Sequence, residues 1–419
     1  MLASSLPSWL PAFLGQADFW RYASIPVVAG LVGWWTNWVA IKLTFAPLEF
    51  IGIPPFLGWQ GIIPRKAAKM AEIFVDSTMD QLGTLGELFE QMEPARIAAH
   101  INAVVGPRLA EYTDEVMRSE NAVLWENLPP TVRRQVYREV EAQMPRLVDN
   151  LMGEIGERVE ELIDFKHMIR SQLVADKALL NKLFLECGHA EFRFLIRSGL
   201  YFGFAFGLIQ LAVWWFYKGV WVLPVFGLLV GFATNWIAIN LIFRPLHPTR
   251  IGPFVLQGLF LKRQAEVAVV WCDIVTKEMI TIRQIIDQMI NGPHAAATRK
   301  LIQKHIRPVV DEVVGLGRPV AQLSVGLRGY AELKDQVGDK AVMVSMDPFN
   351  HWGFNKERGV IVERLLRQRM VEMPPDQFQN LLRPCFQEDE LTLILVGAAL
   401  GLAAGFAQLF LVFGSYVGG

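Results

Sequence analysis

Two stretches of about 20 apolar residues, each interrupted near its middle by a Thr-Asn pair, occur 198 positions apart. The first runs from Pro26 to Leu48 and the second from Pro224 to Leu246. The two copies align with each other without an insertion or deletion. An apolar run of this length can cross a bilayer as a helix. Polar residues that return at fixed places inside such runs predict that the chain is built from a repeated unit.

A second apolar pattern returns at the same offset. It carries three glycines at four-residue spacing, followed by a glutamine. The residues are Gly199, Gly203, Gly207 and Gln210 in the first copy, and Gly397, Gly401, Gly405 and Gln408 in the second. We expect four membrane-spanning helices, at about 23–45, 194–217, 221–243 and 391–413. The prediction is an all-α membrane protein made of two tandem parallel repeat units, 23–217 and 221–414.

Two long polar regions, about 64–189 and 247–389, connect the helices within each unit. Apolar residues recur there at alternating spacings of three and four, as in Ala71, Phe74 and Leu85. This spacing is typical of amphipathic helices. We see no alternating strand pattern, expect a kink at Pro145, and expect extended connectors after the first and third spans. Residues 1–22 are predicted to form an interfacial tail, since they are aromatic and lack the basic start of a signal peptide.

The intramembrane polar motif consists of Thr36, Asn37, Thr234 and Asn235, with Gln210 and Gln408 as candidate partners of the asparagines. Polar side chains at mid-membrane are costly and often mark a pathway. The alternative is interhelical hydrogen bonding, worth about 0.6 kcal/mol per bond. The residue types favour helix packing, and a role in a transport pathway is the alternative.

Small residues predict close packing between the spans. Gly33 and Gly231 lie in the Thr-Asn helices, and the two glycine triplets lie in the other two spans. Helices with such faces approach one another closely in lipid. The alternative interpretation is a flexible gating hinge.

The first copy continues with Phe45-x-Pro47, Pro55-Phe56 and the run from Gly61 to Lys66. Together with the Gly-x-x-Thr-Asn motif, this pattern resembles the bacterial membrane proteins called domain of unknown function 445, which include YheB-like and YjiN-like proteins. The second copy departs from the pattern, because Leu261 stands where Pro64 stands in the first. The resemblance implies a helical membrane protein and names no reaction.

Composition agrees with a membrane protein and argues against several functions. The chain is 52% hydrophobic and 19% charged, against about 25% charged in a typical soluble domain. Its net charge of −1 gives no global field for nucleic acid. Three cysteines make no disulfide framework, and Cys187 and Cys385, which share a repeat position, are interpreted as small buried residues. The seven histidines form no metal motif, and we find no phosphate loop or nucleophile elbow.

We therefore expect no enzyme, no cofactor and no metal. The favoured function is a scaffold or docking protein whose helical domains lie at the membrane surface, with an unknown protein partner. The alternative is a carrier or conduit for a lipid or another apolar molecule, acting as a homo-oligomer, with membrane lipids as partners. A continuous apolar cavity would favour the carrier, and a solid helical core would favour the scaffold.

Orientation follows from basic residues near the helix ends. They are concentrated on the side of the polar regions, at positions such as Lys66, Arg193 and Arg263, whereas Arg21 and Lys218 lie on the other side. This bias predicts the bacterial inner membrane, with both polar regions cytoplasmic and both termini outward.

Overall fold

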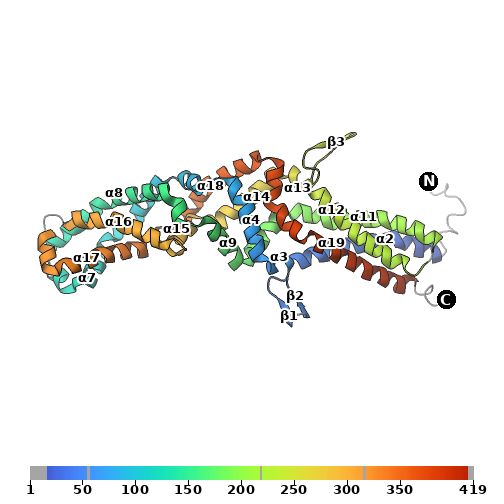
Figure 1. Cartoon of the computed structure of the whole chain (residues 1–419), viewed down its shortest axis with the longest axis horizontal. Helices are drawn as coiled ribbons and strands as arrows, with labels where there is room; N and C mark the ends of the chain where they lie inside the picture. The colour runs from blue at the N-terminus through green and yellow to red at the C-terminus, as the bar shows by residue number, and fades with distance from the viewer. Residues whose placement is uncertain (1–16, 54–56, 218, 315–317, 414–419) are drawn as a thin grey trace, which may run out of the picture. The chain divides into compact units, whose positions relative to one another are not determined.

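The computed structural model describes residues 17–53, 57–217, 219–314 and 318–413, and the chain there is mostly helical (Figure 1). Within these residues, four helices are long and apolar enough to cross a membrane. They are α2 (Ala17–Phe45), α11 (His189–Phe216), α12 (Val222–Phe243) and the C-terminal part, Glu390–Val412, of α19 (Pro375–Phe413). The four spans expected from hydropathy are therefore present, with similar bounds.

The first polar region forms a series of separate helices. They are α3 (Ile62–Arg65), α4 (Ala67–Leu82), α5 (Leu85–Gln91), α6 (Pro94–Val105), the 3-10 turn η1 (Gly106–Arg108), α7 (Leu109–Asn127), α8 (Pro130–Leu162), α9 (Phe165–Ala175) and α10 (Lys177–Cys187). The apolar face that begins at Ala71 is divided at Gly83, whose φ of 103° is left-handed. Such a φ suits glycine and ends α4.

The second polar region is built in the same way. It contains α13 (Leu259–Lys262), α14 (Gln264–Glu278), α15 (Ile282–Asn291), α16 (Ala295–Val314), α17 (Arg318–Val344), the 3-10 turn η3 (Asp347–Asn350) and α18 (Trp352–Glu372). Thr84 and Thr281 start α5 and α15 with capping boxes, in which the threonine accepts from the third helical N–H. Each box satisfies two backbone donors at a helix start.

The structure adds to or differs from the expected pattern at three places. The connectors are antiparallel hairpins, β1 (Ile51–Ile53) with β2 (Leu57–Trp59) and β3 (Thr249–Ile251) with β4 (Phe254–Leu256). Three-residue strands are too short to show an alternating pattern. α8 passes through Pro145, and its non-helical residue is Arg158. The end of the predicted tail, from Ala17, is already helical, while residues 1–16 lie outside the described part.

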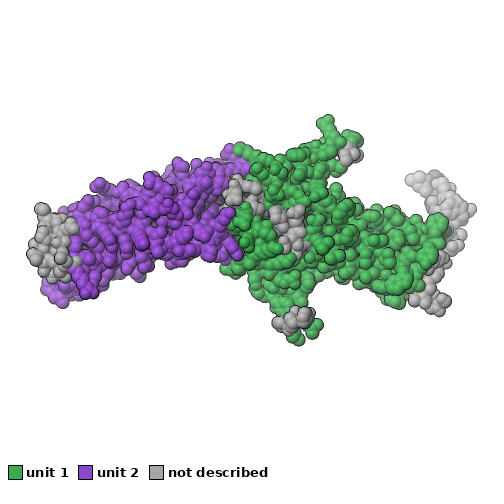
Figure 2. All heavy atoms as spheres, in the orientation of Figure 1, with its two compact units in different colours: residues 1–78, 173–271, 370–419 green, residues 79–172, 272–369 purple. Residues whose placement is uncertain are grey.

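The chain divides into two compact units, and both predicted repeat units contribute to each (Figure 2). Unit 1 comprises 1–78, 173–271 and 370–419, and unit 2 comprises 79–172 and 272–369. Unit 1 therefore contains the four apolar helices and both hairpins. Unit 2 contains α5 to α8 and α15 to α17.

In unit 1, α2 packs mainly on α11, and α12 packs mainly on α19. The start of α2 and the end of α19 lie at the same end of this bundle (Figure 1). At the other end, a buried aromatic core joins the bundle to the short helices, where Phe260 stacks on Phe378 with ring centroids 4.8 Å apart. A partly buried ion pair between Arg263 and Glu191, 2.7 Å long, links the start of α14 to α11.

Candidate functional site

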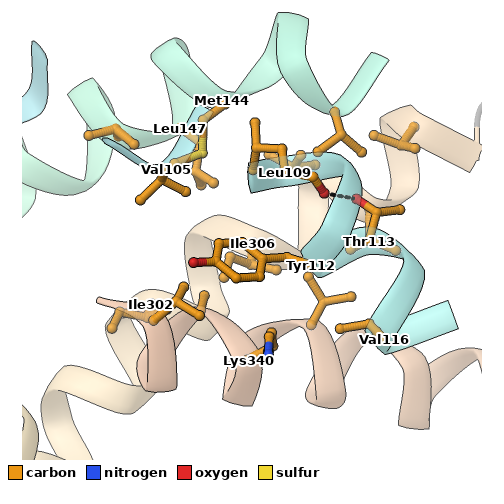
Figure 3. Close-up of a pocket in the computed structure, with 18 of the residues that line it drawn as sticks. Val105, Leu109, Tyr112, Thr113, Val116, Met144, Leu147, Ile302, Ile306 and Lys340 are labelled. Atoms are coloured by element: carbon orange, nitrogen blue, oxygen red, sulfur yellow. Dashed lines mark hydrogen bonds between the residues drawn. The ribbon is translucent and has the colours of Figure 1, made fainter. Parts of the chain in front are cut away.

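Unit 2 contains a cavity of about 1080 Å³. Figure 3 shows part of its lining, which comes from both chain segments of unit 2, 79–172 and 272–369. The labelled residues include Val105, Leu109, Tyr112, Thr113 and Val116 before and within α7, Met144 and Leu147 on α8, Ile302 and Ile306 on α16, and Lys340 on α17. The surface that these residues enclose is mainly hydrocarbon.

The lining follows from the amphipathic pattern of the helices. Leu109, Tyr112 and Val116 are spaced by three and four residues on α7, and Ile302 and Ile306 are spaced by four on α16. Such spacings put side chains on one helix face. The inward faces of these helices form two separate buried clusters, each with partly buried apolar residues around it. The helices thus surround the cavity and do not close it.

Tyrosine hydroxyls next to the cavity are bound to carboxylates. The hydroxyl of Tyr112 donates to Oδ2 of Asp347 at 3.0 Å, and Arg108 donates to the same oxygen at 2.9 Å. Burial, together with the hydrogen bond to Asp347, raises the pKa of Tyr112 above its ordinary value. The hydroxyl of Tyr330 donates to Asp311 at 2.7 Å. Both rings line the cavity while their polar ends are satisfied.

Two further polar residues of the lining, Lys340 and Thr298, differ in their hydrogen bonding. Lys340 forms an ion pair with Glu115, and its Nζ lies 5.2 Å from the centroid of the Tyr112 ring. Thr298 is 3% exposed, and its Oγ1 has no hydrogen-bond partner among the described residues. A buried hydroxyl without a partner is costly.

A large pocket lined by hydrocarbon with few polar groups is typical of a site for an apolar ligand. Among the described residues, no group of three or more His, Cys, Asp or Glu side chains is placed to hold a metal ion. The shape and the lining of the cavity therefore indicate that it can bind an apolar molecule.

The intramembrane asparagines lie at matching places in unit 1. Nδ2 of Asn37 donates to the backbone oxygen of Leu195 at 2.8 Å, and Nδ2 of Asn235 donates to that of Leu393 at 3.0 Å. Both side chains are buried. Gln210 and Gln408 do not accept these hydrogen bonds, because both asparagine amides donate to backbone oxygens. Leu195 already accepts a hydrogen bond from Ser198, and a carbonyl oxygen can accept two.

Glycines make the asparagine contacts possible. A Cβ atom at Gly33 would overlap the backbone oxygen of Gly199, and one at Gly231 would overlap that of Gly397. Further along the same interfaces, a Cβ at Gly203 would lie 2.6 Å from the oxygen of Ala29, and one at Gly405 2.5 Å from that of Leu223. Gly207 and Gly401 likewise face backbone atoms of α2 and α12. The helices touch here through their backbones.

The threonines and glutamines have separate positions. The hydroxyls of Thr36 and Thr234 donate to the carbonyls three residues earlier, at 3.2 and 3.4 Å. Thr36, Gln210 and Gln408 line a void of about 20 Å³ inside the bundle. A water molecule needs at least about 10–15 Å³, so this void has room for one. The polar motif of the bundle lies in a packed helix interface.

The cavity itself could not be predicted from the amphipathic pattern. One of its walls is α17, which supplies Leu333, Val337 and Lys340 to the lining. The four-residue spacing of Leu333, Val337 and Ala341 was the available signal. Of the paired cysteines, Cys187 is buried, and the side chain of Cys385 lies outside the described ones.

Comparisons with known proteins support a membrane protein of uncharacterised function. The chain is 28% identical over 152 residues to a UPF0754 membrane protein of a Nostoc species, a match covering 35% of this chain and 31% of the relative. It is 30% identical over 159 residues to a UPF0754 membrane protein of Nostoc punctiforme, covering 33% of this chain and 38% of the relative. A relative of Microcystis aeruginosa with the same family name is 26% identical over 168 residues, 39% of this chain and 35% of that protein.

The matched segment spans only about a third of the length of these curated relatives. No family model and no solved structure matches the chain. The relatives carry the name UPF0754 and not the family name that the Thr-Asn motif suggested. With the four apolar helices, they support a multi-pass membrane protein from an uncharacterised family.

Proposed function

We propose that this multi-pass membrane protein binds the hydrocarbon part of a lipid, or another long apolar molecule, in the cavity of unit 2. The observation that carries the proposal is the cavity itself, about 1080 Å³ in volume and lined mainly by Val, Leu, Ile and Met. Its volume is slightly above the roughly 300–1,000 Å³ usual for ligand pockets. The protein would act as a carrier or conduit for this molecule.

Energetics favour an occupied cavity. The helices do not close the cavity, so its apolar lining is in contact with water when no guest is bound, at a cost of roughly 25 cal/mol per Å² of apolar surface. Water is a poor occupant because it needs two to four polar partners. An apolar guest supplies the missing contacts.

The scaffold function that the sequence favoured has less support. A scaffold with a docking role needs a rigid surface, and a densely packed helical core would provide one. The inward faces of α8, α16 and α17 instead leave apolar side chains such as Leu147 and Val337 partly exposed toward the cavity. This arrangement is better suited to holding a molecule than to forming a solid platform.

We also propose that the chain consists of two parallel repeat units in the bacterial inner membrane, with both polar regions cytoplasmic. The matching hydrogen bonds of Asn37 and Asn235 support the repeat, since donor and acceptor are both shifted by 198 positions. Parallel repeats are known from other membrane carriers.

Photocrosslinking of lipid tests the proposed binding. The full chain is placed in nanodiscs containing a phospholipid with a photoreactive group on its acyl chain, and crosslinked peptides are mapped by mass spectrometry. We expect crosslinks on unit 2, near Leu147 and Val337, in addition to those on the spanning helices. Crosslinks on the spanning helices alone would refute the proposal.

Two tryptophan substitutions on α17 provide a matched pair. Val337 lines the cavity, whereas Met343 is exposed and is not part of the lining. Val337→Trp should occupy the cavity and reduce the unit 2 crosslinks, leaving those on the spanning helices unchanged. Met343→Trp should change neither. Equal effects of the two substitutions would contradict a site inside the cavity.

A further inference from the structure

The hairpin β1–β2 exposes large apolar side chains on one face. Ile51, Ile53 and Leu57 are 67%, 70% and 74% exposed. Ile51 pairs with Trp59, and Ile53 pairs with Leu57. Residues two apart in a strand, and directly paired residues, lie on the same face. The four side chains therefore form one apolar face, which is called the hairpin face below.

The base of this hairpin is tied to the end of a spanning helix. Nε1 of Trp59 donates to the backbone oxygen of Leu43 at 3.1 Å, and Leu43 lies in the last turn of α2. The backbone N–H of Gly61 donates to the oxygen of Pro47 at 2.9 Å. Tryptophan is enriched at membrane–water interfaces. The hairpin thus begins at the depth where α2 leaves the hydrocarbon region.

Water is a poor environment for the hairpin face. A single two-stranded hairpin is marginally stable in water, and an exposed apolar edge promotes aggregation. Figure 1 shows β1 and β2 projecting sideways from unit 1, away from the bundle. At this place, the end of α2 meets the surface of the bilayer that α2 crosses.

The hairpin β3–β4 has the same attachment and a different surface chemistry. The N–H of Gly258 donates to the oxygen of Pro245, at 2.9 Å, just after the end of α12. Val255 and Leu256 are exposed, and the exposed Arg250 pairs across the hairpin with Val255. Basic residues next to a span are attracted to anionic lipid headgroups. Figure 1 shows this hairpin on the opposite side of unit 1 from β1–β2.

We infer that both hairpins lie in the lipid interface of the membrane that the bundle spans, with the hairpin face turned toward the acyl chains. They act as two anchors, on opposite sides of the bundle, that set its depth in one leaflet. The partner is the lipid surface itself. This inference uses only unit 1 and is independent of the cavity in unit 2.

Fluorescence quenching tests the inference in the full chain. An environment-sensitive fluorescent amino acid replaces Ile53, and the protein is placed in nanodiscs of phosphatidylethanolamine and phosphatidylglycerol. Some of the phospholipids carry a spin label at acyl carbon 5. The matched control places the same amino acid at Val123, which is 74% exposed on α7 of unit 2. Quenching by the spin label should be at least twofold stronger at position 53 than at position 123.

A second measurement distinguishes lipid from protein as the molecule that covers the hairpin face. With the probe at Ile51, Ile53→Asp should reduce quenching, and the conservative Ile53→Val should retain it. Equally weak quenching at positions 53 and 123 would overturn the inference. A blue-shifted emission at position 53 without quenching would also overturn it, because protein and not lipid would then cover the hairpin face.

Discussion

The side-chain amide of Asn37 donates a hydrogen bond of 2.8 Å to the backbone oxygen of Leu195, which lies 158 residues further along the chain. Asn235 makes the same bond to Leu393, also 158 residues away, at 3.0 Å. In both cases the acceptor lies four residues, about one helical turn, before a glycine whose backbone touches the first helix of the pair. These glycines are Gly199 and Gly397. Close backbone approach and a side-chain hydrogen bond therefore occur together at both helix interfaces.

Replacing either asparagine with leucine should destabilise the protein. Asn37→Leu and Asn235→Leu each remove an interhelical bond worth about 0.6 kcal/mol. They also add a branched side chain to a tight interface, where overpacking costs about 1–3 kcal/mol. The midpoint of unfolding in detergent should fall for both variants. Val39→Leu and Ile237→Leu, on the same helices, should change it little, and equal shifts for all four would refute the role of the amides.

Gly33→Ala tests the backbone contact itself. A methyl group there would overlap the oxygen of Gly199, so the helices must move apart at a cost of about 1–3 kcal/mol. The control is Gly153→Ala on α8, where an added Cβ meets nothing within 4 Å. That change should stabilise the helix by up to about 1 kcal/mol. The two variants should therefore shift the unfolding midpoint in opposite directions.

Thr298→Val should stabilise the ligand-free protein. It removes a buried hydroxyl without a partner, whose desolvation costs about 1–3 kcal/mol, and retains the shape of the side chain. Thr276→Val is the control, because Thr276 is equally buried but donates to the oxygen of Cys272 at 2.8 Å. It should destabilise by about 1 kcal/mol. Denaturant unfolding of the delipidated variants measures both, and a loss of stability in Thr298→Val would contradict the assignment of a free hydroxyl.

The stability of unit 2 should depend on pH through Glu154. Hydrogen bonds from Lys304, at 2.7 Å, and from His305, at 2.8 Å, lower the pKa of Glu154 from 4.5 to about 2. A carboxylate with a lowered folded-state pKa contributes stability above its unfolded pKa and loses it as pH falls toward the folded value. The contribution is therefore complete above pH 4.5 and declines between 4.5 and about 2.

Glu154→Gln measures this contribution. The variant should be less stable than the original chain at pH 7, and the difference should narrow when unfolding is repeated at pH 3. Glu160→Gln, on the exposed side of the same helix, removes the same charge as a control and should give a smaller difference at pH 7. A stability difference between Glu154→Gln and the original chain that does not change with pH would refute the lowered pKa of Glu154.

Cysteine labelling tests the proposed orientation. Glu126→Cys on α7 and Gly219→Cys after α11 are made with the three native cysteines replaced by alanine. If the polar regions are cytoplasmic, a thiol reagent that cannot cross the inner membrane should label position 219 in intact cells and miss position 126. The physical basis is the excess of basic residues on the side of the polar regions. Labelling at position 126 alone would invert the orientation.

The sequence by itself determined the four helices long and apolar enough to span a membrane and the helix faces that can pack closely. Apolar length fixes a span, since the hydrocarbon core has a known thickness. The spacing of Gly199, Gly203 and Gly207 fixes which helix face can approach a neighbour, since these residues lack a Cβ. Both are local properties, so they could be predicted from the chain alone.

Only the tertiary structure decided the partners of the asparagines, the hairpins and the cavity. The acceptor for Asn37 is a backbone oxygen, and every residue carries one, so no residue type marks Leu195. A cavity is the space left between faces that all have the same amphipathic pattern as a packed core. Whether Leu147, Ile306 and Val337 meet or stay apart depends on how α8, α16 and α17 pack together, which no single helix encodes.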